Sequence, residues 1–217
     1  SPVGITVLLL VAFVGFAYLA ERKLRIVASL QPLPRWDHPG DRLREVLVNG
    51  LLQQRMIKRE WKPGVMHATI FIGFVSLLLR KLQLFAIGYY EPFAAPGIVG
   101  GVFAWFKDLV ELAVICAVAF AFWRRLVLKP RRLEPNREAL LVLALIMTIM
   151  VTDFLFDGFR FALLSERYPD IAHERDFAFI GGALGAAFSG LLPGALSAGY
   201  HVTYWLQMVV VLSFLVL

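Results

Sequence analysis

Two histidines, His67 and His201, lie inside long apolar stretches of the sequence. A neutral imidazole within a helical bundle is the usual axial ligand of haem iron, and burial favours the neutral form that coordinates. The two residues therefore predict a haem site; the alternative is that each imidazole hydrogen-bonds a neighbouring helix. Helix-rise arithmetic separates them by about 12 Å in depth, which leaves one shared haem or two separate haems open.

Charged side chains in the outer half of the apolar stretches form a second candidate site. Asp153, Asp157 and Arg160 follow i, i+4, i+7 spacing, so they share one face of a helix. We interpret Arg160 as the partner of one carboxylate, and we assign proton transfer to Asp153 and Asp157. Arg80, Lys81 and Arg160 are predicted to contact a quinone. The alternative for Arg80 and Lys81 is that they extend outward to the lipid headgroups.

A group of basic residues precedes His67. Arg55, Lys58 and Arg59 lie just before the apolar stretch that contains this histidine. We predict that they bind haem propionates. A basic flank on the cytoplasmic side of a membrane helix explains them equally well.

The composition indicates what must position these groups. Of 217 residues, 59% are hydrophobic and 18% are charged, with a mean hydropathy of +0.70. Soluble domains have about 45–50% apolar and about 25% charged residues, so a soluble enzyme, a disordered tail and a nucleic-acid-binding module are excluded. The single cysteine, Cys116, provides no disulfide framework and no cysteine-based cluster. No phosphate-binding loop, zinc-protease motif or catalytic triad is present.

The sequence predicts an all-α integral membrane protein, with residues 1–217 forming one module. A span requires about 20 apolar residues, and five stretches meet this requirement. Lys107, Asp108 and Glu111 begin the third stretch and are interpreted as interfacial anchors. An amphipathic helix is predicted over 41–59 on the cytoplasmic interface, and a short outer helix over 177–192. The predicted spans are 3–20, 64–88, 100–123, 139–163 and 194–217.

The basic residues are unevenly distributed between the connecting segments. Segments 21–62 and 124–138 hold ten and six of the 22 lysines and arginines, whereas 80–111 and 153–176 hold three each. Basic loops remain in the cytoplasm. The N-terminus is therefore predicted to lie outside, and the last span to run from outside to inside.

Three stretches resemble a known family: residues 55–74, residues 108–112 leading to Arg124-Arg125, and residues 200–205. Together they resemble the N-terminal membrane module of heterodisulfide-reductase-related iron–sulfur oxidoreductases. That module is similar to the gamma subunit of respiratory nitrate reductase, a five-span cytochrome b. Within the family, the chain is most similar to membrane reductases that pass electrons from electron-transfer flavoprotein to menaquinone.

The resemblance implies a multi-pass protein of the bacterial plasma (inner) membrane in which His67 and His201 are axial ligands of haem b. It also implies a cytoplasmic iron–sulfur domain after the last span, which would make this chain part of a longer protein. Two departures bear on the haem count. The nitrate-reductase subunit has two histidines on its second span, where this chain has only His67. Relatives often have a histidine at the position of Gln207. The haem count is therefore one or two.

The sequence thus predicts a membrane electron-transfer module that is part of a quinone-linked oxidoreductase. Its b-type haem would pass electrons between a cytoplasmic iron–sulfur or flavoprotein partner and the menaquinone pool. Iron–sulfur clusters are expected only outside this chain. The alternatives are a small polytopic transporter or proton channel, in which the buried charges line a polar path, and a membrane anchor without a cofactor.

Overall fold

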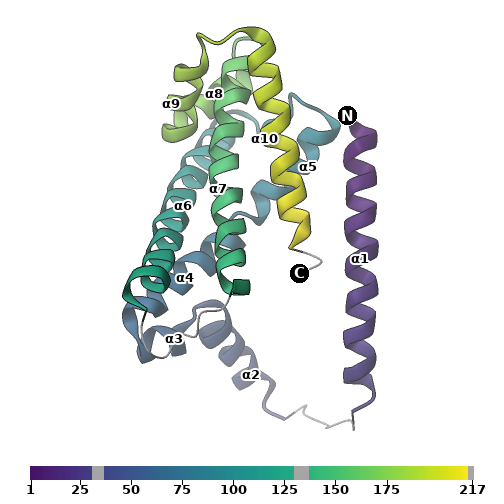
Figure 1. Cartoon of the computed structure of the whole chain (residues 1–217), viewed down its shortest axis with the longest axis vertical. Helices are drawn as coiled ribbons and strands as arrows, with labels where there is room; N and C mark the ends of the chain where they lie inside the picture. The colour runs from purple at the N-terminus through teal and green to yellow at the C-terminus, as the bar shows by residue number, and fades with distance from the viewer. Residues whose placement is uncertain (31–36, 130–136, 215–217) are drawn as a thin grey trace.

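The computed structural model describes residues 1–30, 37–129 and 137–214, and this part of the chain is helical with no strand. Figure 1 shows a bundle whose long helices run roughly side by side. The elements, in chain order, are α1 (Pro2–Ala28), α2 (Pro39–Glu45), the π-helical η1 (Val46–Leu51), α3 (Gln54–Arg59), α4 (Trp61–Ser76), α5 (Leu78–Tyr89), α6 (Gly97–Trp123), the π-helical η2 (Arg124–Leu128), α7 (Arg137–Leu164), α8 (Pro169–Phe177), α9 (Phe179–Phe188) and α10 (Pro193–Ser213).

Four helices of the described chain are long and apolar enough to cross a membrane: α1, the α4–α5 pair, α7 and α10. The predicted third span, 100–123, is occupied by α6, which has 27 residues. It does not qualify by composition, because every stretch of 18 residues within it includes Lys107, Asp108 and Glu111. The all-helical membrane class is supported, and the count of five spans remains a prediction.

Three predicted segments differ in detail from the helices observed. The second span, 64–88, is divided at Leu77, whose backbone (φ −81°, ψ 0°) separates α4 from α5. The amphipathic helix predicted over 41–59 consists of three short pieces, α2, η1 and α3, whose leucines are exposed. The outer helix predicted over 177–192 is α9, and it is preceded by α8, which we did not predict.

The core is organised around α7, which packs against α10, α9 and α6. Small residues allow the close approach of α9, because a Cβ on Gly185 would lie 2.9 Å from the Phe161 Cβ. Among the described elements, helix α1 packs mainly against α5 and α10, and most of its surface is exposed. Exposed apolar side chains are expected where a helix faces lipid.

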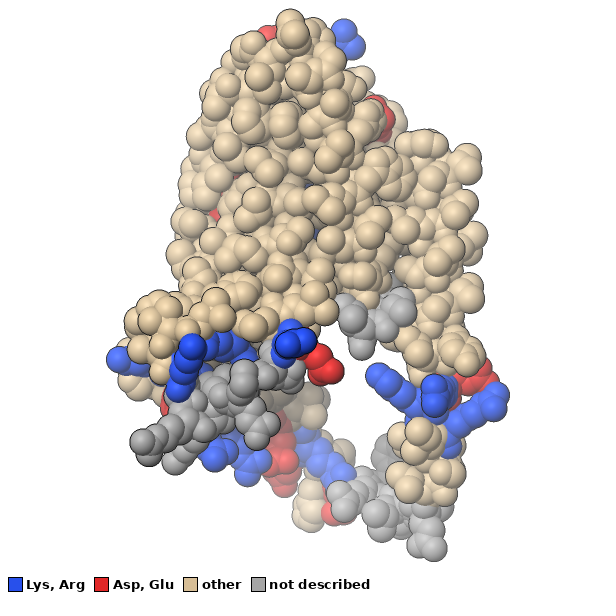
Figure 2. All heavy atoms as spheres, viewed as in Figure 1, with Lys and Arg blue, Asp and Glu red and all other residues tan. Residues whose placement is uncertain are grey.

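Lysine and arginine side chains gather at one end of the molecule, around the C-terminal end of α1 and near α2 and α3 (Figure 2). We call this the basic end. The opposite end carries α8 and α9 (Figure 1). This asymmetry is the pattern from which the sequence analysis predicts an outside N-terminus, and the orientation remains a prediction.

Candidate functional site

Nine charged side chains of the described residues are buried between the helices, and we call them the ionic cluster. They come from α5, α6, α7 and α8, and none has more than 8% of its surface exposed. A buried charge costs several kcal/mol unless it is paired and hydrogen-bonded, so their partners decide whether the arrangement is stable. The members are Arg80, Lys81, Lys107, Asp108, Glu111, Asp153, Asp157, Arg160 and Glu174.

Arg80 and Lys81 of α5 face Asp153 and Asp157 of α7. The Arg80 Nε and Nη2 atoms donate to Asp153 Oδ1 at 3.0 and 2.8 Å, and Nη2 also donates to Asp157 Oδ1. The Lys81 ammonium donates to Asp153 Oδ2 at 3.0 Å. Asp153 is therefore neutralised by two cations from the adjacent helix.

Lys107 of α6 forms ion pairs with three carboxylates. Its Nζ atom lies 2.9 Å from Asp157 Oδ2, 2.9 Å from Asp108 Oδ1 and 3.2 Å from Glu111 Oε2. The other oxygen of Asp108 accepts hydrogen bonds from the backbone N–H groups of Ile180 (2.7 Å) and Gly181 (3.1 Å). These groups belong to the first turn of α9, where an anion is favoured by the unsatisfied N–H groups and the helix dipole.

Arg160 forms the outer end of the ionic cluster with Glu174 of α8. Its Nη1 atom donates to Glu174 Oε2 at 2.6 Å, and its Nη2 atom donates to the Phe93 carbonyl at 2.8 Å. Gln83 connects this pair to the rest, because it accepts from Arg80 Nη1 (2.6 Å) and donates to Glu174 Oε1 (2.9 Å). The polar contacts are therefore continuous from Glu111 to Glu174.

The contacts correct two sequence interpretations. Arg160 pairs with Glu174 rather than with an aspartate of its own helix, because Arg80 and Lys107 already occupy the aspartates. Lys107 and its two acidic neighbours on α6 are buried and are not interfacial anchors, since they satisfy one another and α7. Glu174 was not predicted from the sequence. The available signal was Arg160, a charged residue of an apolar helix that lies 14 residues before Glu174 in the sequence.

His67 and His201 both have exposed side chains. No hydrogen bond or ion pair of the described residues involves either imidazole. The Phe74 and Phe214 rings, 6.1 Å apart, mark a common level on α4 and α10. His67 lies seven residues from this level on α4, toward the basic end. His201 lies thirteen residues from it on α10, toward the opposite end. At the rise of an α-helix, the two residues are therefore separated by about 30 Å along the helix axes. The two rings cannot ligate one iron atom.

The surroundings of the two imidazoles test how well they fit a haem. His201 borders a narrow cavity of about 10 Å³, which is too small for a porphyrin. Each ring is nevertheless free to coordinate from an exposed face. Each histidine could therefore ligate a separate haem iron, but the two do not form one enclosed haem site.

The predicted propionate ligands lie on α3, directly before α4. Arg55, Lys58 and Arg59 are exposed, and none of them has an ion pair with a described residue. Helix α3 packs on α4 because residue 64 is glycine: a Cβ there would lie 2.5 Å from the Ile57 Cα. The basic side chains are thus held close to the start of the helix that carries His67.

An apolar cavity of about 540 Å³ lies between α1, α4, α5, α7 and α10. Small-molecule sites commonly have volumes of about 300–1,000 Å³. Lys81 is the one member of the ionic cluster that lines it, whereas Arg80 and Arg160 are enclosed by their carboxylate partners. Its other lining residues are Phe13, Phe74, Leu77, Leu78, Leu79, Leu82, Phe85, Met150, Val211, Leu212 and Phe214.

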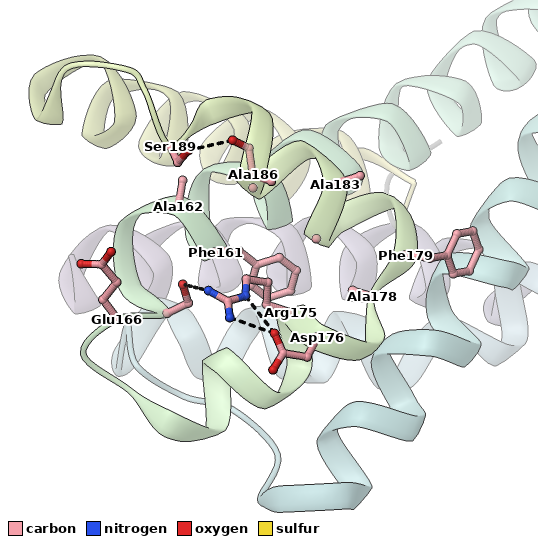
Figure 3. A pocket seen from close by; sticks show the side chains of 13 residues that line it. Phe161, Ala162, Glu166, Arg175, Asp176, Ala178, Phe179, Ala183, Ala186 and Ser189 are labelled. Atoms are coloured by element: carbon pink, nitrogen blue, oxygen red, sulfur yellow. Dashed lines mark hydrogen bonds and ion pairs between the residues drawn. The ribbon is translucent and has the colours of Figure 1, made fainter.

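A second cavity, of about 530 Å³, lies between the end of α7 and helices α8 and α9 (Figure 3). Phe161 and the small residues of α9 form its apolar surface. Arg175 is the cationic group that lines it. Its guanidinium already bonds the Ser165 hydroxyl (3.1 Å) and the Asp176 carboxylate (2.8 Å), so its charge is paired without a ligand.

The fold and the ionic cluster define a polytopic helical membrane protein with paired charges inside the bundle. Comparison with curated proteins identifies one similar protein, the "Probable iron-sulfur-binding oxidoreductase FadF" of Bacillus subtilis (strain 168), which is 28% identical over 210 residues. The alignment covers 93% of this chain and 28% of FadF, so the chain spans little more than a quarter of that relative. No family model and no solved structure matches the chain.

Proposed function

We propose that this chain is the membrane electron-transfer module of an iron–sulfur oxidoreductase. The observation that carries the proposal is that His67 and His201 lie on helices apolar enough to span a membrane and have no hydrogen-bond or ion-pair partner among the described residues. The His201 ring contacts the Tyr200 ring edge-on, with the centroids 5.2 Å apart. Polar groups at membrane depth require a partner, and for an imidazole a cofactor metal is a suitable one. The similarity to an iron-sulfur-binding oxidoreductase supports a redox role. A cofactor-free anchor would leave both imidazoles unexplained.

Haem b is the proposed cofactor, and it supplies reversible one-electron transfer when bound. His67 and His201 would each ligate a separate haem, because about 30 Å of helix separates them. The second ligand of each iron would come from outside the described residues. Arg55, Lys58 and Arg59 would pair with the propionates of the haem near His67.

Menaquinone is the proposed electron partner within the membrane, and we assign it to the cavity lined by Lys81. The apolar side chains around this cavity suit an isoprenoid chain, and the Lys81 ammonium suits a quinone carbonyl. Electron-transfer flavoprotein and a cytoplasmic iron–sulfur domain are the proposed partners at the basic end. In this assignment the quinone would lie between the level of the Phe74–Phe214 contact and the ionic cluster.

A reduced-minus-oxidised absorption spectrum tests the haem assignment. Purified protein from haem-replete membranes is expected to show a b-type signal. The variants His67→Ala and His201→Ala should each remove one component, so that the double variant shows none. His38→Ala is the matched control because its side chain is exposed in the connection before α2. Wild-type protein without a b-type signal, including protein extended past Leu217, would overturn the assignment.

Titration with a short-chain menaquinone tests the cavity. Lys81→Met should raise the Kd about tenfold, since a hydrogen bond from a charged group is worth about 1.5–3 kcal/mol. Quenching of tryptophan fluorescence reports binding. Leu82→Trp, which fills the cavity, should also weaken binding, whereas Lys23→Met on the exposed end of α1 should not. Equal affinity in all four proteins would place the quinone elsewhere.

A further inference from the structure

The charges of the ionic cluster do not balance. It holds four cations, Arg80, Lys81, Lys107 and Arg160, and five carboxyl groups. If every group were ionised, the cluster would carry one net negative charge inside the protein. An uncompensated buried charge is strongly unfavourable, and a carboxyl group avoids the penalty by keeping its proton. One of the five carboxyls is therefore expected to be neutral.

Four of the five carboxyls have contacts that favour the ionised form. Asp153 accepts from Arg80 and Lys81, and Asp157 faces Arg80 and Lys107. Asp108 has Lys107 and two backbone N–H donors. Glu174 has Arg160, the Gln83 amide and the backbone N–H of Ala95 at 3.1 Å. Hydrogen bonds donated to a carboxylate stabilise its charge.

Glu111 differs from the other four. Its single cationic partner is Lys107, at 3.2 Å, and Lys107 also serves Asp108 and Asp157 at 2.9 Å. Its Oε1 atom is buried and has no hydrogen-bond partner among the described residues. Asp108 Oδ1 also lacks a hydrogen bond within the described part of the chain, but the other oxygen of Asp108 accepts from two backbone N–H groups, whereas Glu111 Oε2 accepts only from Lys107 there. Asp153 of α7 is a second negative charge that acts on Glu111. Only a protonated acid can donate a hydrogen bond to a neighbouring carboxylate.

The groups that face Glu111 come from three helices. Lys107 and Asp108 belong to its own helix, α6; Asp153 and Asp157 come from α7; and Arg80 and Lys81 come from α5. The aspartates disfavour a second negative charge there, and the cations are already shared with those aspartates. The position therefore favours a neutral side chain.

We propose that Glu111 is the proton-binding group of the ionic cluster and that it is neutral at pH 7. Asp153 and Asp157, to which the sequence analysis assigned proton transfer, are then permanent counterions. Loss of the Glu111 proton leaves the cluster with one net negative charge, and its recovery restores neutrality. This inference goes beyond the proposed electron-transfer function and does not depend on a bound haem or quinone.

Infrared spectroscopy of the purified full chain in lipid nanodiscs tests the proposal. A protonated carboxylic acid has a carbonyl band that is separate from carboxylate bands and shifts in D2O. The wild-type protein at pH 7 should show such a band for a buried acid. Glu111→Gln should remove it, and Glu111→Asp should shift its frequency, because the band belongs to the side chain that holds the proton. Glu91→Gln is the control because Glu91 is an exposed carboxyl outside the cluster.

Two outcomes would overturn the proposal: absence of a buried-acid band from wild-type protein, and persistence of that band in Glu111→Gln. Glu111→Gln should fold, because it replaces one neutral side chain with another of similar size; circular dichroism checks this. Should that variant fail to fold, Glu111→Asp provides a second test, since it should shift the band without removing it. The haem spectrum is a separate readout, so failure of the electron-transfer proposal remains distinguishable.

Discussion

Replacing Arg80 with methionine is expected to lower the free energy of unfolding by about 3–5 kcal/mol, the largest effect of any single substitution proposed for this chain. Arg80 is 1% exposed and contacts both Asp153 and Asp157. Methionine fills much of the same space but leaves a surplus of negative charge in the bundle. Unfolding in a mixed-micelle denaturant series, followed by circular dichroism, measures the change.

The control for Arg80 is Arg22→Met, on the exposed part of α1, which should change stability by less than about 0.5 kcal/mol. A second comparison isolates the charge effect. Arg80→Met combined with Asp153→Asn should recover part of the loss, because Lys107 still neutralises Asp157. A destabilisation below about 1 kcal/mol for Arg80→Met would show that the ion pairs are not what holds α5 against α7.

Arg160→Met is expected to cause the second-largest loss of stability. The loss should be greater in α8 than in the long helices of the bundle. Glu174 would keep the Gln83 amide and the Ala95 N–H but would lose its cation. The expected loss is again about 3 kcal/mol or more, because one buried charge remains unpaired. Hydrogen exchange should show the loss as faster exchange in α8 and in the 90–96 turn, with α7 and α10 still protected.

The matched control is Arg175→Met, since Arg175 is an arginine of α8 whose pair with Asp176 is partly exposed. Exposed pairs contribute about 0–1 kcal/mol, so this variant should exchange like the wild type. Pairing Arg160→Met with Glu174→Gln should return protection to α8. Uniform loss of protection across the whole chain would contradict the prediction that the Arg160–Glu174 pair stabilises mainly α8.

Hydropathy predicted the membrane helices well, because lipid imposes one simple requirement on a spanning segment. The expected spans at 3–20, 139–163 and 194–217 correspond to α1, α7 and α10. The break at Leu77 was not predicted, since no proline or glycine marks that position. Helix α8 was missed because its polar sequence, Pro169–Phe177, resembles a loop when its buried contacts are unknown.

The ionic cluster was predictable only in part. The spacing of Asp153 and Asp157 placed them correctly on one face of α7, because that relation is local to one helix. Their partners on α5 and α6 depend on how the helices pack, and the sequence contains no local signal for that choice. The charged residues of the spans can be counted from the sequence. The excess of one carboxyl over the cations becomes apparent only when Glu174 of α8 is included in the ionic cluster.

The charges of α6 also have a consequence for how the protein is made. Each charged residue at the centre of a helix opposes insertion by the translocon by about 2.5–3.5 kcal/mol, and α6 has three near its middle. The ion-pair partner of Lys107 on another helix, Asp157 of α7, is synthesised after α6. Helix α6 is therefore expected to wait at the translocon until α7 emerges from the ribosome, so that the two helices enter the bilayer together.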